Sequence, residues 1–191
     1  MTEHELLAEF TRLGALKQGH FQLTSGLHSR QYVQCAAVFE YPAHAEKIAA
    51  ELVKKLPQDI DTVIAPAIGG ISLGYEVARA LHCRFIFAER EKGRMALRRG
   101  FTLHPQEKIL VVEDVVTTGG SVQEILELGR KHDCKVQAVA ALVDRSGGRV
   151  DFHVPFISLL KLDIETFVPE DCPLCRADEP LTQPGSKGKL D

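Results

Sequence analysis

Apolar positions along the chain follow two alternating spacings. Runs of consecutive apolar residues predict buried strands, whereas apolar residues repeated every three or four positions predict one-sided helices. The predicted strands are His20–Leu23, Tyr32–Val38, Asp61–Ala65, Arg84–Ala88, Ile109–Val112, Val136–Val143 and Phe156–Leu162. The predicted helices begin near Thr2, Pro42, Ile71 and Ser121. Capping boxes, Thr2 with Glu5 and Ser121 with Glu124, favour the first and last of these starts.

From Pro42 onward, strands and helices alternate, which is the pattern of βαβ units. Right-handed crossovers between such units give a mostly parallel sheet with helices on both faces, so we predict an α/β fold. The length of 191 residues suits a single domain. We divide it into an N-terminal helix and hood (1–40), an α/β core (41–169) and a loosely held C-terminal tail (170–191) rich in proline, glycine and charge.

Charge and hydropathy argue against several functions. A net charge of −3 without a basic stripe argues against binding to nucleic acid or to a membrane surface. No apolar run is long enough to span a bilayer, and Met1–Phe10 lacks the layout of a signal peptide, so we expect a cytoplasmic protein with five reduced cysteines. Cys172 and Cys175 form a C-x-x-C pair. Because no second pair and no H-x-x-x-H would complete a zinc site, we interpret it as a structural turn.

Four polar or glycine-rich loops directly follow predicted strands. They begin at Pro66, Glu89, Glu113 and Asp144. In an open parallel sheet, ligands bind outside the carboxyl ends of the strands, so we expect these loops to meet at one edge and form one site.

The segment Ile109–Val122 joins a strand, two acids, a loop of small residues and a helix. The loop Thr117–Ser121 at the helix start offers N–H donors, hydroxyls and the positive end of the helix dipole, and therefore predicts a phosphate site. Its spacing matches neither the P-loop nor the dinucleotide-binding motif. Glu113 and Asp114 precede the loop and can accept hydrogen bonds from a ribose diol, which indicates a ribose 5-phosphate ligand. An ordinary βα turn with a capped helix is the alternative.

Residues 70–74 match the G-x-S-x-G nucleophile motif of hydrolases, with Ser72 at its centre, and Asp144 and His153 follow in triad order. The nucleophile turn comes directly off its strand, whereas the five residues Pro66–Gly70 separate Ile71 from the predicted strand. We therefore favour a glycine-rich loop whose backbone N–H groups bind pyrophosphate.

Cations dominate the segment Glu89–Gly100. They are Arg90, Lys92, Arg94, Arg98 and Arg99. A solvated face would explain any one of them, but as a group they suit a mobile loop that closes on pyrophosphate and excludes water.

Arg145 lies at the end of the next predicted strand, within D-R-S-G-G. Its planar guanidinium can hold a carboxylate with two parallel hydrogen bonds. A surface ion pair with Asp144 or another acid is the alternative.

The order E-D-V-V-T-T-G-G-S resembles the phosphoribosyl-pyrophosphate signature of type I phosphoribosyltransferases. Over residues 19–185, further segments resemble the orotate phosphoribosyltransferases of that family. They are the substrate hood (Phe21–Val33), the pyrophosphate loop (Ile64–Gly74), the start of the catalytic loop (Phe87–Gly93), the orotate-side arginine loop (Leu142–Gly148) and the E-D-C-P-L-C ending of one bacterial branch (Glu170–Cys175).

This resemblance implies a type I phosphoribosyltransferase fold with a small N-terminal hood. It also implies transfer of the phosphoribosyl group from 5-phosphoribosyl 1-diphosphate to orotate, giving orotidine 5′-phosphate and diphosphate in pyrimidine biosynthesis. The implied catalytic residues are Glu113, Asp114, Arg90 and Lys92. The implied ligands of 5-phosphoribosyl 1-diphosphate are Glu113, Asp114, Val115, Val116, Thr117, Thr118, Gly119, Gly120, Ser121, Arg90, Lys92 and Arg94, and those of orotate are Thr117 and Arg145. Mg²⁺ bound mainly through substrate oxygens is expected, and so is a homodimer in which the basic loop completes the neighbouring subunit's site.

The sequence departs from that family at three places. Better-known members carry lysines where Thr24 and Gly69 stand, and they have a K-x-H element that Glu89–Gly100 lacks. Which of Lys92, Arg94, Arg98 and Arg99 takes over is therefore open. The alternatives are a purine or uracil phosphoribosyltransferase and a regulatory protein that senses 5-phosphoribosyl 1-diphosphate. Arg145 favours an acidic base, and no basic DNA-binding module is visible.

Overall fold

The computed structural model describes residues 1–23 and 25–184. Its elements are α1 (Glu3–Arg12), β1 (Leu16–Gln22), β2 (His28–Val33), η1 (Cys35–Phe39), α2 (Pro42–Val53), β3 (Thr62–Pro66), α3 (Gly70–Leu81), β4 (Arg84–Glu91), β5 (Arg94–Leu97), β6 (Lys108–Val116), α4 (Gly120–Lys131), β7 (Lys135–Asp144), β8 (Phe156–Lys161), β9 (Thr166–Phe167), η2 (Pro169–Asp171), α5 (Pro173–Arg176) and β10 (Leu181–Thr182). None of the helices in this part of the chain is long and apolar enough to cross a membrane.

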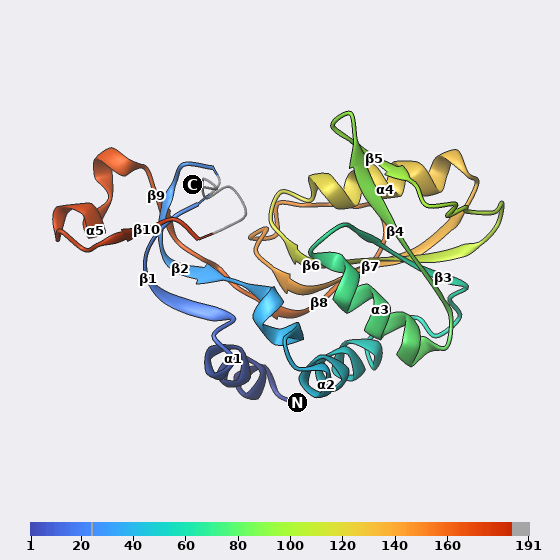
Figure 1. The fold of residues 1–191 in the computed structure, drawn as a ribbon, viewed down its shortest axis with the longest axis horizontal. Helices are drawn as coiled ribbons and strands as arrows, with labels where there is room; N and C mark the ends of the chain where they lie inside the picture. The colour runs from blue at the N-terminus through green and yellow to red at the C-terminus, as the bar shows by residue number, and fades with distance from the viewer. Residues whose placement is uncertain (24, 185–191) are drawn as a thin grey trace.

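The larger of two sheets has the strand order β5-β4-β3-β6-β7-β8. In this sheet the strands β4, β3, β6, β7 and β8 run parallel to one another, and the edge strand β5 runs antiparallel to β4. Helices α2 and α3 pack on one face and α4 on the other (Figure 1). The predicted α/β fold with a mostly parallel sheet is therefore confirmed.

The central strands β6 and β7 are buried on both faces, as their unbroken apolar runs require. They pair in parallel along nearly their whole length, from Lys108 opposite Lys135 to Val116 opposite Asp144. This pairing brings the two strands' carboxyl ends, and the loops that follow them, to one edge of the sheet.

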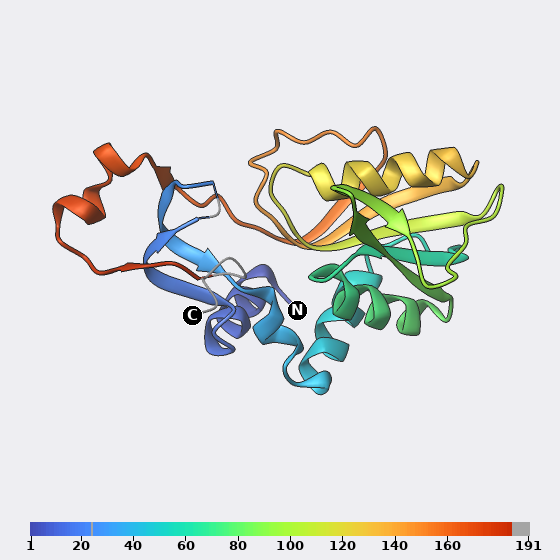
Figure 2. The same ribbon diagram turned by 45° about the horizontal axis from the view of Figure 1, so that its top comes forward.

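The smaller sheet, with the order β10-β1-β2-β9, forms the hood and lies as a separate lobe beside the core (Figure 2). Its outer strands come from the C-terminal part of the chain: β9 pairs with β2 and β10 pairs with β1. Within residues 170–184, strand β10 pairs with β1 and the side chains of Cys172 and Leu174 are buried, so this part of the expected tail is attached to the hood. The expected tail residues 185–191 lie outside the described part of the chain.

Two predicted segments differ from the structure. The strand predicted over Tyr32–Val38 ends at Val33, and the chain turns into the short helix η1, whose Cys35 and Val38 face the core. The basic segment Glu89–Gly100, expected as a loop, is a β-hairpin of β4 and β5. Lys92 and Gly93 both have positive φ, the conformation that a two-residue hairpin turn needs.

Candidate active site

The loop between β6 and α4 encloses a small polar cavity of about 70 Å³. Its lining residues are Glu113, Val115, Val116, Thr117, Thr118, Gly119, Gly120, Ser121 and Val122. Gly119 has φ +75°, and a Cβ there would lie 2.9 Å from Phe152 and Val150, so this position admits only glycine without rearrangement. The volume exceeds what a single water needs and accommodates a small tetrahedral anion.

The start of α4 differs from the predicted capping box. Gly119 is the N-cap, and no side chain caps it within the described residues. Glu124 turns away, because its carboxylate accepts a hydrogen bond from the Met95 backbone at 2.7 Å and pairs with Arg90 at 3.0 Å. The first-turn N–H groups therefore stay open toward the cavity, which suits an anion better than a capping box would.

Glu113 and Asp114 lie in β6, near its carboxyl end. Glu113 is buried, and its carboxylate accepts a hydrogen bond from the Asp114 backbone at 3.1 Å. Burial, with the charge of Asp114 added, raises the pKa of Glu113 to about 9. The neutral form of Glu113 is therefore favoured, and in that form the carboxyl group can donate a hydrogen bond as well as accept one.

The glycine-rich loop after β3 approaches the acid pair. A Cβ on Gly69 would lie 2.8 Å from the Asp114 carboxylate, and the peptide bond between Ala67 and Ile68 is cis. A larger cavity of about 540 Å³ opens here, in the size range of ligand pockets. Its lining residues are Ala36, Ala37, Phe39, Glu40, Ile68, Gly69, Ser72 and Asp114. The expected convergence of the loops after β3 and β6 is thus confirmed.

Ser72, Asp144 and His153, the residues of the hydrolase alternative, do not form a catalytic triad in the described structure. Ser72 lies within α3 and not on a sharp turn. The Asp144 carboxylate accepts a hydrogen bond from the Ser146 backbone at 2.8 Å, and His153, largely exposed, pairs with Asp151 at 3.2 Å. Neither therefore activates Ser72.

The basic hairpin reaches the phosphate loop through Arg90. Its guanidinium lies 3.5 Å from the Ser121 hydroxyl and is held by the ion pair with Glu124. Arg98 and Arg99 are engaged in the hairpin by Glu91 and Glu89.

Lys92 and Arg94, at the exposed tip, have no ion pair among the described residues. Of the four cations left open by the sequence, these two are accordingly the available ones. Thr24, the other position where the family carries a lysine, lies outside the described residues.

Arg145 is half-buried at the end of β7. Its backbone N–H donates to the Val116 carbonyl at 2.8 Å, which ties it to the end of the acid-bearing strand. Its Nε is buried without a hydrogen-bond partner, and no ion pair within the described residues involves it. Burial lowers the pKa of Arg145, an effect that the neighbouring Tyr32 and Cys35 oppose. The alternative of a surface ion pair with Asp144 is wrong, and the guanidinium is free to bind a carboxylate.

Sequence reasoning missed the role of one residue near the site and anticipated the packing of another. Glu124, taken as a capping residue, anchors Arg90 over the phosphate loop. Cys35 is buried, and its Sγ lies 3.9 Å from the Asp114 carbonyl. The neighbouring acids and burial raise the pKa of Cys35 well above its usual value, burial being the larger cause, so it packs as a neutral thiol. The apolar run around Cys35 predicts that packing, whereas nothing in the local pattern indicates the role of Glu124, which depends on contacts with the distant residues Arg90 and Met95.

An anion-sized cavity at a helix start, an acid pair beside it and an arginine without an ion pair among the described residues lie at the same edge of the sheet, an arrangement suited to a phosphorylated sugar and an acidic partner. The family model of the phosphoribosyl transferase domain matches residues 36–172, and the chain belongs to that family.

Sequence relatives extend this match to nearly the full length. A relative from Thermotoga maritima named orotate phosphoribosyltransferase is 55% identical over 178 residues, 93% of this chain and 95% of that one. One of the same name from Caldicellulosiruptor bescii is 53% identical over 99% of this chain and 100% of its own. The solved structure of the orotate phosphoribosyltransferase from Aeropyrum pernix is similar in fold, with a TM-score of 0.71 at 24% identity, covering 82% of this chain and 93% of that one.

Proposed function

We propose that this protein transfers the phosphoribosyl group of 5-phosphoribosyl 1-diphosphate to orotate, giving orotidine 5′-phosphate and diphosphate in pyrimidine biosynthesis. The relatives of the same length that carry this name support the activity. The observation that supports the choice of base is Arg145, whose buried Nε has no hydrogen-bond partner among the described residues. Orotate differs from uracil and from the purine bases by a carboxylate, which a guanidinium can bind with two parallel hydrogen bonds.

In the proposed reaction, a ring nitrogen of orotate attacks the anomeric carbon of the ribose. The new C–N bond forms as the C–O bond to diphosphate breaks, the leaving group takes the electron pair, and the ring nitrogen loses its proton. A transition state with positive charge on the ribose needs a fixed sugar and a stabilised leaving group more than a nucleophilic side chain. Glu113 and Asp114 would hold the ribose hydroxyls, and the loop Thr117–Ser121 would hold the 5′-phosphate.

The basic hairpin belongs to the same proposal. Arg90, whose guanidinium lies 3.5 Å from the Ser121 hydroxyl, would bind an oxygen of 5-phosphoribosyl 1-diphosphate. Lys92 and Arg94 at the tip supply charge for the departing diphosphate. Thr117, the first residue of the loop after β6, and Arg145 would contact orotate.

Mg²⁺ fits the groups present. Asp114 lines the larger cavity with carboxylate oxygens, the hard ligands that this ion prefers, and the substrate would supply most of the others. When bound, Mg²⁺ would neutralise part of the diphosphate charge. We further propose a homodimer with shared sites and a cytoplasmic location, both expected from the sequence.

The proposal is tested by assaying the purified protein with 5-phosphoribosyl 1-diphosphate, Mg²⁺ and, separately, orotate, uracil, hypoxanthine and adenine. We expect orotidine 5′-phosphate from orotate and a kcat/KM at least about 10³-fold lower for the other bases, because they leave Arg145 unpaired. Comparable turnover of uracil or a purine would contradict the assignment. Binding of 5-phosphoribosyl 1-diphosphate without turnover of any base would favour the regulatory alternative.

A further inference from the structure

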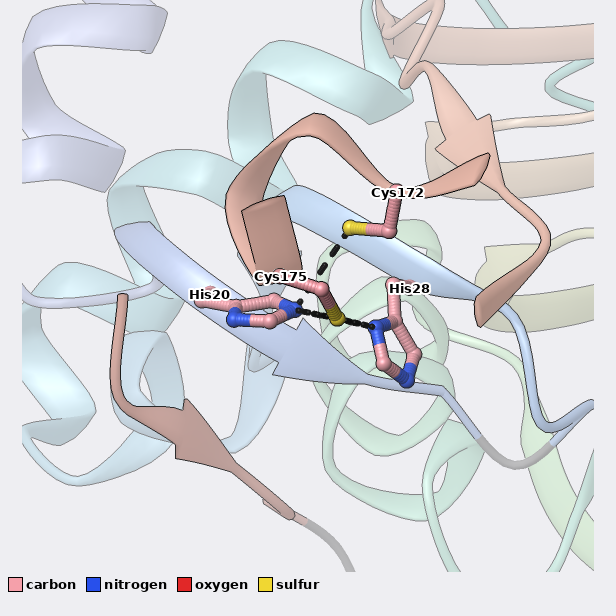
Figure 3. Close-up of side chains that lie close together, drawn as sticks. All are labelled: His20, His28, Cys172 and Cys175. Atoms are coloured by element: carbon pink, nitrogen blue, oxygen red, sulfur yellow. Dashed lines mark hydrogen bonds between the residues drawn. The ribbon is translucent and has the colours of Figure 1, made fainter. Parts of the chain in front are cut away.

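Four side chains with metal-binding atoms meet in the hood, outside the sugar-phosphate site. His20 comes from β1, His28 from β2, Cys172 precedes α5 and Cys175 lies in it (Figure 3). The ligand atoms of all four lie within 4.8 Å of one another. His20, His28 and Cys172 are buried, and Cys175 is exposed.

The separations between these atoms approach the edges of a metal-centred tetrahedron. His20 Nε2 lies 2.9 Å from His28 Nδ1, 3.6 Å from Cys172 Sγ and 3.7 Å from Cys175 Sγ. Cys175 Sγ lies 3.2 Å from His28 Nδ1. Zinc–nitrogen and zinc–sulfur bonds of about 2.0 and 2.3 Å give tetrahedral edges of roughly 3.3–3.8 Å. Side-chain shifts of about half an ångström would therefore complete the coordination.

The second nitrogen of His20 is already fixed. Its Nδ1 lies 2.8 Å from the carbonyl oxygen of Glu179. Because a carbonyl only accepts, Nδ1 carries the hydrogen, which leaves Nε2 as the ligand atom that faces the cluster. A backbone carbonyl that holds the outer N–H of a histidine is the usual support of a metal ligand.

Hydrogen bonds alone do not account for this arrangement. The single lone pair of His20 Nε2 faces three groups that could donate to it: His28 Nδ1 and the two thiols. Similarly, the one hydrogen that His28 Nδ1 can carry faces both His20 Nε2 and Cys175 Sγ. A cation at the centre would use one lone pair from each of the four residues, so every contact would be satisfied at once.

We propose that His20, His28, Cys172 and Cys175 bind one structural Zn²⁺. Two thiolates and two imidazoles select zinc over Mg²⁺ or Ca²⁺, which prefer oxygen. Four protein ligands leave no open position, as in zinc sites that hold a fold together. This revises the interpretation of the C-x-x-C pair as a mere turn, because the hairpin supplies the two ligands that the sequence did not reveal.

The hood needs such a cross-link. Its outer strands β9 and β10 have two residues each, and between Pro169 and Thr182 only Cys172 and Leu174 are buried. So small an apolar core rarely holds a segment in place without a disulfide or a metal. The proposed zinc would join the C-terminal segment to both strands of the β1–β2 hairpin.

Metal content tests the proposal directly. The untagged wild-type protein, dialysed against EDTA and analysed by inductively coupled plasma mass spectrometry, should retain close to one zinc per chain. The double variant Cys172→Ser/Cys175→Ser should retain none. The matched control Cys83→Ser/Cys134→Ser, which removes two free cysteines outside the cluster, should bind zinc like the wild type.

Cobalt provides a second measurement that does not depend on how the variants fold. Co²⁺ added to the metal-free wild-type protein under reducing conditions should give the intense d–d bands of a tetrahedral site and a thiolate-to-cobalt charge-transfer band. Restoring Zn²⁺ should raise the Tm of the hood or of the whole protein by about 5 °C or more. A wild-type protein without zinc and without these cobalt bands, or a chain mass two hydrogens lower from a Cys172–Cys175 disulfide, would overturn the proposal.

Discussion

At the scale of single residues, Arg145 decides which base the site accepts. Replacing Arg145 with alanine removes a half-buried guanidinium that no acid of the described residues neutralises. We expect Arg145→Ala to raise the KM for orotate by roughly 30–100-fold, the loss of a charge-assisted hydrogen-bonded pair. The KM for 5-phosphoribosyl 1-diphosphate should change by less than about 3-fold, because the phosphate loop and acid pair are untouched.

The neighbouring Arg149 offers a matched control for this measurement. It is exposed, and its Nε donates to the Ser146 carbonyl at 3.0 Å. Arg149→Ala should leave both KM values near those of the wild type in steady-state kinetics. Equal losses for both substrates in Arg145→Ala would refute the assignment of this residue to orotate.

The buried acid Glu113 should cost stability as the pH rises. Its pKa is raised from 4.5 to about 9 by burial and by Asp114, so the folded protein holds this proton more tightly than the unfolded chain does. The contribution of Glu113 to the free energy of unfolding therefore falls as the pH rises from about 4.5 toward 9. Above that range it falls no further. Glu113→Gln abolishes this dependence. It should stabilise the protein by about 1–3 kcal/mol at pH 7.5 and by much less at pH 5.

Urea denaturation of both proteins across pH 5–8.5 measures the difference. Glu127→Gln, at an exposed position on α4, serves as the control and should give no pH-dependent gain. A constant stability difference across the pH range would show that Glu113 is not held protonated by the fold.

What the sequence reveals at this scale depends on whether the partners are local. The acid pair, the phosphate loop and Arg145 stand in short motifs at strand ends, so their chemistry could be predicted. His20 and His28 could not be recognised, because each lies alone on its strand and 144 or more residues separate them from the cysteines: Cys172 lies 152 residues from His20, and Cys175 lies 147 from His28. Two histidines flanking a short polar turn are the only signal that the sequence contains.

At the scale of elements, apolar periodicity located the core strands and helices well. The predicted strands Asp61–Ala65 and Val136–Val143 correspond to β3 and β7, and the Thr2–Glu5 capping box begins α1 as expected. Prediction failed where a contact across the fold competes with a local motif. Glu124 pairs with Arg90 and with the Met95 backbone and so cannot cap α4.

The β4–β5 hairpin shows the same competition. Its many charges and irregular spacing indicate a mobile loop, yet antiparallel pairing from Ala88–Leu97 to Glu91–Arg94 orders it. Bidentate contact between Arg99 and Glu89, at 2.7 and 2.9 Å, joins its two sides. The hairpin therefore holds Arg90 over the phosphate loop while its tip stands away from the sheet (Figure 1).

At the scale of the whole molecule, the hood and the core meet around the site. The hood strand β2 carries Tyr32 toward the surroundings of Arg145, and η1 lines the larger cavity opposite the loop after β3. The layers of the core, a mostly parallel sheet with helices on both faces, could be predicted from the alternation of strands and helices. The sheet of the hood could not be predicted, because it combines strands from both ends of the chain. Pairing between such distant segments leaves no periodic signal in either.

The proposed dimer predicts how two variants that are impaired at low orotate concentration should behave together. Arg145→Ala disables the site of its own subunit, whereas Lys92→Ala, at the exposed hairpin tip, should disable the site of the neighbouring subunit. In a mixed dimer, the Lys92→Ala subunit keeps Arg145 and receives an intact Lys92 from its partner, so one site in two is complete. Random reassociation gives mixed dimers about half of the time, so activity should recover to about a quarter of the wild-type value.

Co-refolding equal amounts of the two variants, followed by the orotate assay, measures this recovery. Mixing Arg145→Ala with the double variant Arg145→Ala/Lys92→Ala is the control, because no combination of these subunits contains a complete site. If Lys92 instead serves its own subunit, every mixed dimer has one damaged group in each site, and the activity stays at the level of the separate variants. Recovery in the first mixture alone therefore requires that the hairpin tip act across the interface, whereas the contact of Arg90 with Ser121 lies within one chain.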